Sequence, residues 1–189
     1  MAVFLDLFPA WGLMRLLGLV SYVLLFAGVS LGILYSFPTI TGKSKLTVHK
    51  AHLFATNGGT LLGLLHGVIT VIDTYTPFTW SDVLIPFSAS HSPVLTGIGT
   101  LTAYGLLVLI FTSDIRHKLG RKLWLAIHFL AYPIFAGALI HGFFEGTDTK
   151  LAGIRLLYAA SVFVILTLTI LRGMLRRPET RHQPAGRTL

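Results

Sequence analysis

The sequence contains no cysteine and few charged residues, and each shortage excludes a class of protein. Without cysteine there is no disulfide, no thiolate metal site, no cysteine nucleophile and no covalent cofactor attachment through a CxxCH motif. Only 12% of the 189 residues are charged, whereas 53% are hydrophobic. This composition is typical of a membrane protein and far from that of an average soluble domain. Any cofactor must be held by histidine, carboxylate or backbone groups.

Long apolar runs predict an all-α, polytopic transmembrane bundle of about five helices. A bilayer core of roughly 30 Å takes about 20 helical residues, and five runs are long enough. The N-terminus lacks the basic region and small-residue cleavage site of a secretory signal, so we expect the first run to be a mature helix. A short amphipathic segment can precede it at 3–9. The five runs cover approximately residues 11–36, 51–73, 94–113, 123–144 and 151–175.

The net charge of +8 does not point to nucleic acid, because the basic residues lie in short segments between or after the apolar runs. The segments on the other side are acidic. By the positive-inside rule we expect the N-terminus outside and the C-terminus in the cytoplasm of a cell membrane, in keeping with a bacterial inner membrane. The basic clusters are Lys43, Lys45 and Lys50; Arg116, Lys118, Arg121 and Lys122; and Arg172, Arg176, Arg177, Arg181 and Arg187, against Asp6, Asp73, Asp82, Glu145 and Asp148.

The organisation predicted is one membrane domain, residues 1–175, followed by a basic tail, 176–189. No GxGxxG or P-loop pattern follows a strand-like run, so the sequence supports neither a dinucleotide nor a nucleoside triphosphate site. The outer loop, residues 74–93, contains WSDVLIPF, which can form a short interfacial helix anchored by Trp80 and Phe87. Two interpretations stay open: a loop packed over the helix ends, or a lid over an outer cofactor.

Four histidines lie within the apolar runs. His52 and His66 are fourteen residues apart in the second run, and His128 and His141 are thirteen apart in the fourth. At about 1.5 Å rise per residue each pair spans roughly 20 Å. The two helices are expected to be parallel, so they offer two histidines at the inner level and two at the outer. This pattern favours two b-type haems, each bound by two imidazoles, over isolated histidines hydrogen-bonded between helices.

The angular spacing places the two histidines on nearly the same face in the second run, but not in the fourth. Fourteen steps of about 100° bring His66 within roughly 40° of His52, whereas thirteen leave His141 roughly 140° from His128. Pro133 lies between the latter two, so we expect a kink, or an associated wide turn, to redirect His141. Small residues between the histidines suit either a macrocycle or a packed helix. These are Gly58, Gly59, Gly63, Gly137 and Ala138.

Arg15 is an intramembrane charge near the outer end of the first run. Its side chain can reach the interface, pair with haem propionates, or raise the reduction potential of the outer haem as a nearby positive charge. His49, one turn before His52, can contact propionates or substitute as a ligand. His91 lies in the outer loop, and we expect His117 and His182 to be solvated.

The segments 117–143 (HKLGRKLWLAIHFLAYPIFAGALIHGF) and 48–68 (VHKAHLFATNGGTLLGLLHGV) resemble the ferric reductase-like transmembrane domain. That haem-bearing module occurs in ferric reductases, NADPH oxidases and the haem subunit of the bacterial periplasmic methionine sulfoxide reductase system. The resemblance covers roughly residues 12–175. It implies that His52 pairs with His128 on an inner haem and His66 with His141 on an outer haem. It also implies that Arg15 lies near the haems and Phe135 between them, and it includes the 82–87 and 146–149 segments.

The chain lacks the C-terminal flavin and nicotinamide domains of the larger members of that family. We therefore expect a di-haem conduit that takes electrons from a separate flavoprotein or a membrane quinol. The outer acceptor would be ferric iron, oxygen or a redox partner. This makes the chain a possible oxidoreductase that depends on a separate donor. The alternatives are a haem-binding anchor subunit without its own substrate and a proton or metal transporter that uses the histidines.

Overall fold

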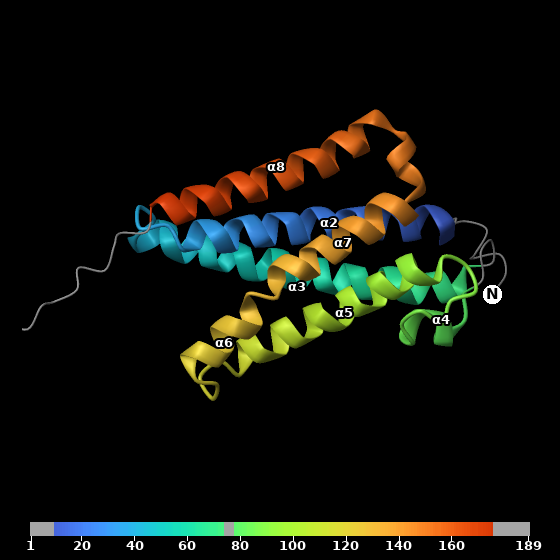
Figure 1. Cartoon of the computed structure of the whole chain (residues 1–189), viewed down its shortest axis with the longest axis horizontal. Coiled ribbons are helices and arrows are strands. Elements are labelled where there is room, and N and C mark those ends of the chain that lie inside the picture. The colour runs from blue at the N-terminus through green and yellow to red at the C-terminus, as the bar shows by residue number, and fades with distance from the viewer. Residues whose placement is uncertain (1–9, 74–77, 176–189) are drawn as a thin grey trace, which may run out of the picture.

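The computed structural model describes residues 10–73 and 78–175, and this part of the chain is helical, without strands (Figure 1). Five spans are long and apolar enough to cross a membrane, so the predicted polytopic helical bundle is confirmed. The predicted segment at 3–9 and the tail at 176–189 lie outside the described residues. The elements are α2 (Ala10–Tyr35), α3 (Gly42–Ile72), α4 (Trp80–Leu84), α5 (Pro93–Asp114), α6 (Arg121–His128), α7 (Ala131–Glu145), η1 (Thr147–Lys150) and α8 (Ala152–Met174).

The second span begins earlier than predicted. Helix α3 starts at Gly42, nine residues before the apolar run begins at 51, so Lys43, Lys45 and Lys50 lie on the helix and not in a loop. Lysine is a good helix former, and a helix can continue past the hydrocarbon while its charged side chains stay in the headgroup region. Hydropathy marks only the part of a helix that lipid surrounds, which explains the error.

Charge separates the two ends of the bundle. The C-terminal ends of α2, α5 and α8 and the N-terminal ends of α3 and α6 meet at one end, which carries most of the basic residues (Figure 1). We call this the basic end. The opposite, acidic end carries Asp73, Asp82, Glu145 and Asp148, together with Lys150 and Arg155. The positive-inside rule predicts that such a basic end lies in the cytoplasm.

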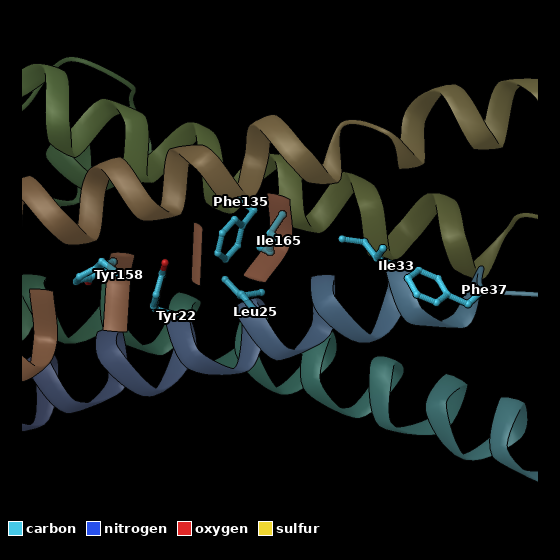
Figure 2. Close-up of a cluster of buried hydrophobic side chains, with 7 residues drawn as sticks. All are labelled: Tyr22, Leu25, Ile33, Phe37, Phe135, Tyr158 and Ile165. Atoms are coloured by element: carbon cyan, nitrogen blue, oxygen red, sulfur yellow. The ribbon is translucent and has the colours of Figure 1, made fainter. Parts of the chain in front are cut away.

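Helix α2 is central to the core. Its buried side chains Tyr22 and Leu25 lie with Phe135 of α7 and Ile165 of α8, as Figure 2 shows. The Tyr22 ring stacks on Phe135 at 5.5 Å between centroids, and its hydroxyl is hydrogen-bonded to that of Ser161. A tyrosine hydroxyl inside a membrane needs such a partner, because an unsatisfied polar group in hydrocarbon costs several kcal/mol, on the order of 2–7. This contact fixes α8 against α2.

Small residues bring α2 and α3 into close contact. A Cβ on Gly59 would lie 3.0 Å from the Leu25 side chain, and one on Gly63 would lie 3.0 Å from Ser21 Oγ. The Ser21 hydroxyl donates to the Gly59 carbonyl at 2.7 Å. Of the two uses that the sequence left open for these glycines, the structure shows helix packing. Gly137 makes the corresponding close contact with Thr102 of α5.

The fourth span is broken where Pro133 predicts a kink. Helix α6 ends at His128 and α7 begins at Ala131. Proline has no N–H and its ring clashes with the carbonyl four residues earlier, here that of Phe129. The backbone responds with i−3 hydrogen bonds, Leu130 N–H to the Ile127 carbonyl at 2.9 Å and Tyr132 N–H to the Phe129 carbonyl at 3.3 Å. The kink is confirmed, but the turn is tightened, so the expected wide turn is wrong.

The tightening partly corrects the angle between the two histidines of this span. Each residue of a 3₁₀ turn rotates the chain by about 120°, roughly 20° more than in an α-helix. Three such residues reduce the ideal offset of roughly 140° to about 80°. The change of axis direction at the break supplies the remaining adjustment, which places His128 on α6 and His141 on α7 on sides that both face α3.

The outer loop forms the short helix that its sequence predicts. Thr79 and Asp82 make a capping box at the start of α4, with Thr79 N–H donating to the Asp82 carboxylate at 2.8 Å. The loop is packed over helix ends: Thr100 Oγ1 of α5 donates to the Val83 carbonyl at 2.9 Å, and Val83 also touches Gly67 of α3. Phe87 has φ 68° and packs against Gly97. Residues 74–77 lie outside the described part.

Candidate functional site

The four intramembrane histidines meet in two pairs at different depths. We call His52 of α3 and His128 of α6 the inner pair, and His66 of α3 and His141 of α7 the outer pair. The ring centroids are 6.4 Å apart in the inner pair and 6.3 Å in the outer, with interplanar angles of 73° and 72°. The two pairs share α3 and take their second histidine from α6 and α7, and their near identity indicates a common geometric requirement.

That separation suits one metal ion between two imidazoles. A histidine nitrogen binds a first-row metal at about 2.0 Å, and it lies about 1.1 Å from its own ring centroid, so two opposed ligands place the centroids about 6.2 Å apart. The stacked rings of Trp124 and His128 are closer, at 5.0 Å between centroids. The gap between the rings of each pair therefore has the width of a nitrogen–metal–nitrogen axis.

Hydrogen bonds hold three of the four rings in one tautomer. Nδ1 of His52 donates to the Gly28 carbonyl at 2.7 Å, that of His66 to the Met14 carbonyl at 2.9 Å, and that of His141 to the Leu95 carbonyl at 2.9 Å. A carbonyl only accepts, so Nδ1 carries the proton and Nε2 keeps its lone pair. This is the usual support of a metal-binding histidine, because it fixes the ring and raises its basicity.

A glycine lies one turn after each accepting carbonyl and makes room for the ring. A Cβ on Gly18 would lie 3.1 Å from the His66 ring, one on Gly32 would lie 3.1 Å from the His52 ring, and one on Gly99 would lie 2.8 Å from the His141 ring. The three carbonyl–glycine motifs are Met14 with Gly18, Gly28 with Gly32, and Leu95 with Gly99.

These motifs repeat with the histidine spacing. Gly18 and Gly32 are fourteen residues apart on α2, as are the histidines that they face on the antiparallel α3. Our sequence interpretation missed these glycines and considered only those between the histidines. The matched spacing of fourteen on consecutive apolar runs was the available signal.

His128 is the exception among the four. Within the described residues its buried Nδ1 has no hydrogen-bond partner, and the same is true of Trp124 Nε1. The two rings stack at an interplanar angle of 22°. Ser30 Oγ, which lies on α2 between the two residues that contact His52, is also buried without a partner. Unsatisfied buried polar atoms are uncommon, and those of His128 and Trp124 adjoin the inner pair.

The donor set fits a metal that brings its own equatorial ligands. Among the described residues no group of three or more His, Cys, Asp or Glu side chains is placed to hold a metal ion. Structural zinc takes four protein ligands and catalytic zinc three, whereas haem iron needs only two axial ones. Two imidazoles per site, facing each other across a gap with glycines beside them, fit a haem. Helices α3 and α7 do not pack closely on each other, so the histidines bridge the space between them.

Arg15 forms an ion pair with Asp148. Its Nε donates to one carboxylate oxygen at 3.0 Å, and a terminal nitrogen donates to the other. The side chains are 38% and 21% exposed. The pair joins α2 to η1, within the 146–149 segment, and lines a shallow cavity of about 290 Å³ with Gly12, Leu16 and Leu19. Arg15 follows Met14 in the chain, whose carbonyl accepts from His66, so the ion pair lies at the same depth of α2 as the outer pair.

Phe135 is buried at 7% exposure between the levels of the two pairs, in contact with Tyr22.

The remaining histidines belong to neither pair. His91 is exposed before α5, and His117 is exposed between α5 and α6. The His49 ring lies 5.2 Å from that of Tyr35 at the basic end, and Lys45 Nζ lies 4.9 Å from the same Tyr35 ring. His182 lies outside the described residues.

The comparisons with protein-family models, curated proteins and solved structures found no match for this chain.

Proposed function

We propose that this chain binds two haem b groups, one at the inner pair and one at the outer pair, and conducts electrons across a cell membrane. The observation that carries the proposal is the pair of matched sites, with ring centroids 6.4 and 6.3 Å apart and the planes at 73° and 72°. Carbonyl-bonded Nδ1 atoms and the adjacent glycines support it. The resemblance of the sequence to the ferric reductase-like transmembrane domain leads to the same proposal.

Haem supplies one-electron redox chemistry, and the protein binds, orients and insulates it. The two imidazoles of each pair would hold the haem between them, and with both used as ligands the protein would offer no open site for oxygen or peroxide. The residues therefore favour outer-sphere electron transfer over chemistry at the metal. Helix α4 packs over the ends of α3 and α5 through Val83, which supports the interpretation of the outer loop as packed over the helix ends.

The direction follows from the expected topology. Electrons enter at the cytoplasmic, basic end from a separate flavoprotein or a membrane quinol. They leave at the outer pair to ferric iron, oxygen or a redox partner. The levels are roughly 20 Å apart, since fourteen residues separate the histidines of α3. Phe135 and Tyr22 fill the space between the levels and keep water out of it.

The test is the haem content of purified protein, from a reduced-minus-oxidised b-type spectrum and a haem-to-protein ratio. We expect a ratio near two, which falls to about one in His66→Leu and in His128→Leu. His91→Leu, at an exposed histidine, is the matched control and keeps the wild-type ratio. Protein purified without a Soret band, after expression with ample haem, overturns the proposal and leaves the transporter alternative.

A haem-binding anchor subunit would give the same spectrum, so it needs a separate experiment. Dithionite-reduced protein is mixed with ferric chelate, oxygen or a quinone, and reoxidation of the b-type band is followed. Rapid reoxidation by one of them supports a conduit with that acceptor. Failure with all three, together with reoxidation only by a partner protein, favours the anchor role.

A further inference from the structure

We infer that the two sites are unequal, and that the inner pair holds its haem at the higher reduction potential because Trp124, and not a backbone carbonyl, positions His128. The inference rests on the proposed haem binding. Its basis is the carbonyl–glycine motif, which seats His52, His66 and His141 and is missing at His128.

The carbonyl–glycine motif of α5 does not recur at the inner level. At the outer level His141 meets the Leu95 carbonyl and Gly99. Thirteen residues further along α5, the spacing that separates His128 from His141, stand Val108 and Thr112. Helix α5 is unbroken, so thirteen steps of about 100° turn these two residues roughly 140° away from the face of Leu95 and Gly99.

His128 is positioned differently. The span breaks directly after it, and its ring stacks on Trp124, one turn earlier on α6. Its Nδ1 has no hydrogen-bond partner among the described residues.

The chemical consequence is a difference in ligand basicity. A hydrogen bond from Nδ1 to a carbonyl increases the electron density on the imidazole, which stabilises the ferric state of a bound haem and lowers its potential. Both ligands of the outer pair have this bond, but only His52 has it in the inner pair.

The test begins with two single-site variants. His66→Leu keeps the inner site and His52→Leu keeps the outer, and redox titration of the b-type band gives one potential for each. We expect the inner-only variant to have the higher potential.

Trp124 is tested as a positioning residue in the His66→Leu background. Trp124→Phe keeps an aromatic ring for stacking and should preserve both haem content and potential, whereas Trp124→Leu should lower the haem content of the inner site. Equal or reversed potentials in the two single-site variants overturn the inference. So does a Trp124→Leu variant whose haem content equals that of Trp124→Phe. Lack of haem in the wild-type protein would instead overturn the proposed function.

Discussion

The glycine beside each carbonyl-bonded histidine makes a specific prediction, sharpest at Gly99. In Gly99→Ala the added Cβ would lie 2.8 Å from Cε1 and Nδ1 of His141, whereas ordinary contact begins at 3.4 Å. The ring must therefore move by about 0.6 Å, the difference between these two distances. Its Nδ1 already lies 2.9 Å from the Leu95 carbonyl, so a shift of that size away from the helix takes the bond beyond the usual limit of about 3.2 Å.

The magnitude follows from what such a bond contributes to a metal site. Loss of a supporting hydrogen bond typically lowers metal affinity by 10–100-fold, or about 1.4–2.8 kcal/mol. We expect Gly99→Ala to weaken haem binding at the outer pair by this factor and to leave the inner pair occupied. Haem titration of the apoprotein should show one unchanged and one weakened site.

The chain offers two matched controls for this variant. Gly105→Ala, on the same helix, places a Cβ 2.7 Å from Ile134 and creates the same crowding away from any histidine. Gly153→Ala, on α8, meets no atom within 4 Å. Both controls should keep two haems of wild-type affinity. If Gly99→Ala binds haem as Gly105→Ala does, the glycine does not seat the histidine and the reasoning is refuted.

Two further predictions concern charge and backbone geometry. Asp148→Asn leaves Arg15 uncompensated and should raise the potential of the outer haem, Arg15→Leu should lower it, and the double variant should return close to wild type in a redox titration. Unchanged potentials in both single variants would show that the ion pair is too remote to act. Pro133→Ala restores the N–H that can bond to the Phe129 carbonyl, so α6 and α7 should join and rotate His128 away from His52. The haem-to-protein ratio should fall toward one while the helical circular dichroism stays, and a ratio of two would show that the break does not aim the histidine.

The number and order of the spans could be predicted from the sequence, because apolar length reports directly what lipid surrounds. The boundaries were less certain for the same reason. Helix α3 continues through Lys43 to Lys50, where hydropathy falls although the hydrogen bonding goes on. The kink at Pro133 was predictable from the missing N–H, but its direction was not. Whether the turn tightens or widens depends on packing against α5, which no local pattern contains.

The sequence predicted the four histidines of the candidate site and their two levels, but it did not predict the groups that surround them. Spacing alone placed two histidines at each of two levels, since helical rise converts residue number into depth. The carbonyls of Met14, Gly28 and Leu95 carry no side-chain signature, so the bonds that fix the rings were invisible. The ion pair between Arg15 and Asp148 joins residues 133 positions apart. It depends on how the chain turns back from α7 through η1, which the sequence pattern does not predict.

The inequality of the two sites bears on the direction of transfer. With the higher potential at the inner level, an electron moves outward against the difference in potential between the sites. A membrane voltage, negative inside, favours the same movement. A full crossing contributes about 2.3 kcal/mol per 100 mV. The two levels are separated by roughly 20 Å of a core of roughly 30 Å, so this step gains about two thirds of that, or about 1.5 kcal/mol per 100 mV. Outward transfer in proteoliposomes should therefore accelerate as an inside-negative voltage is imposed.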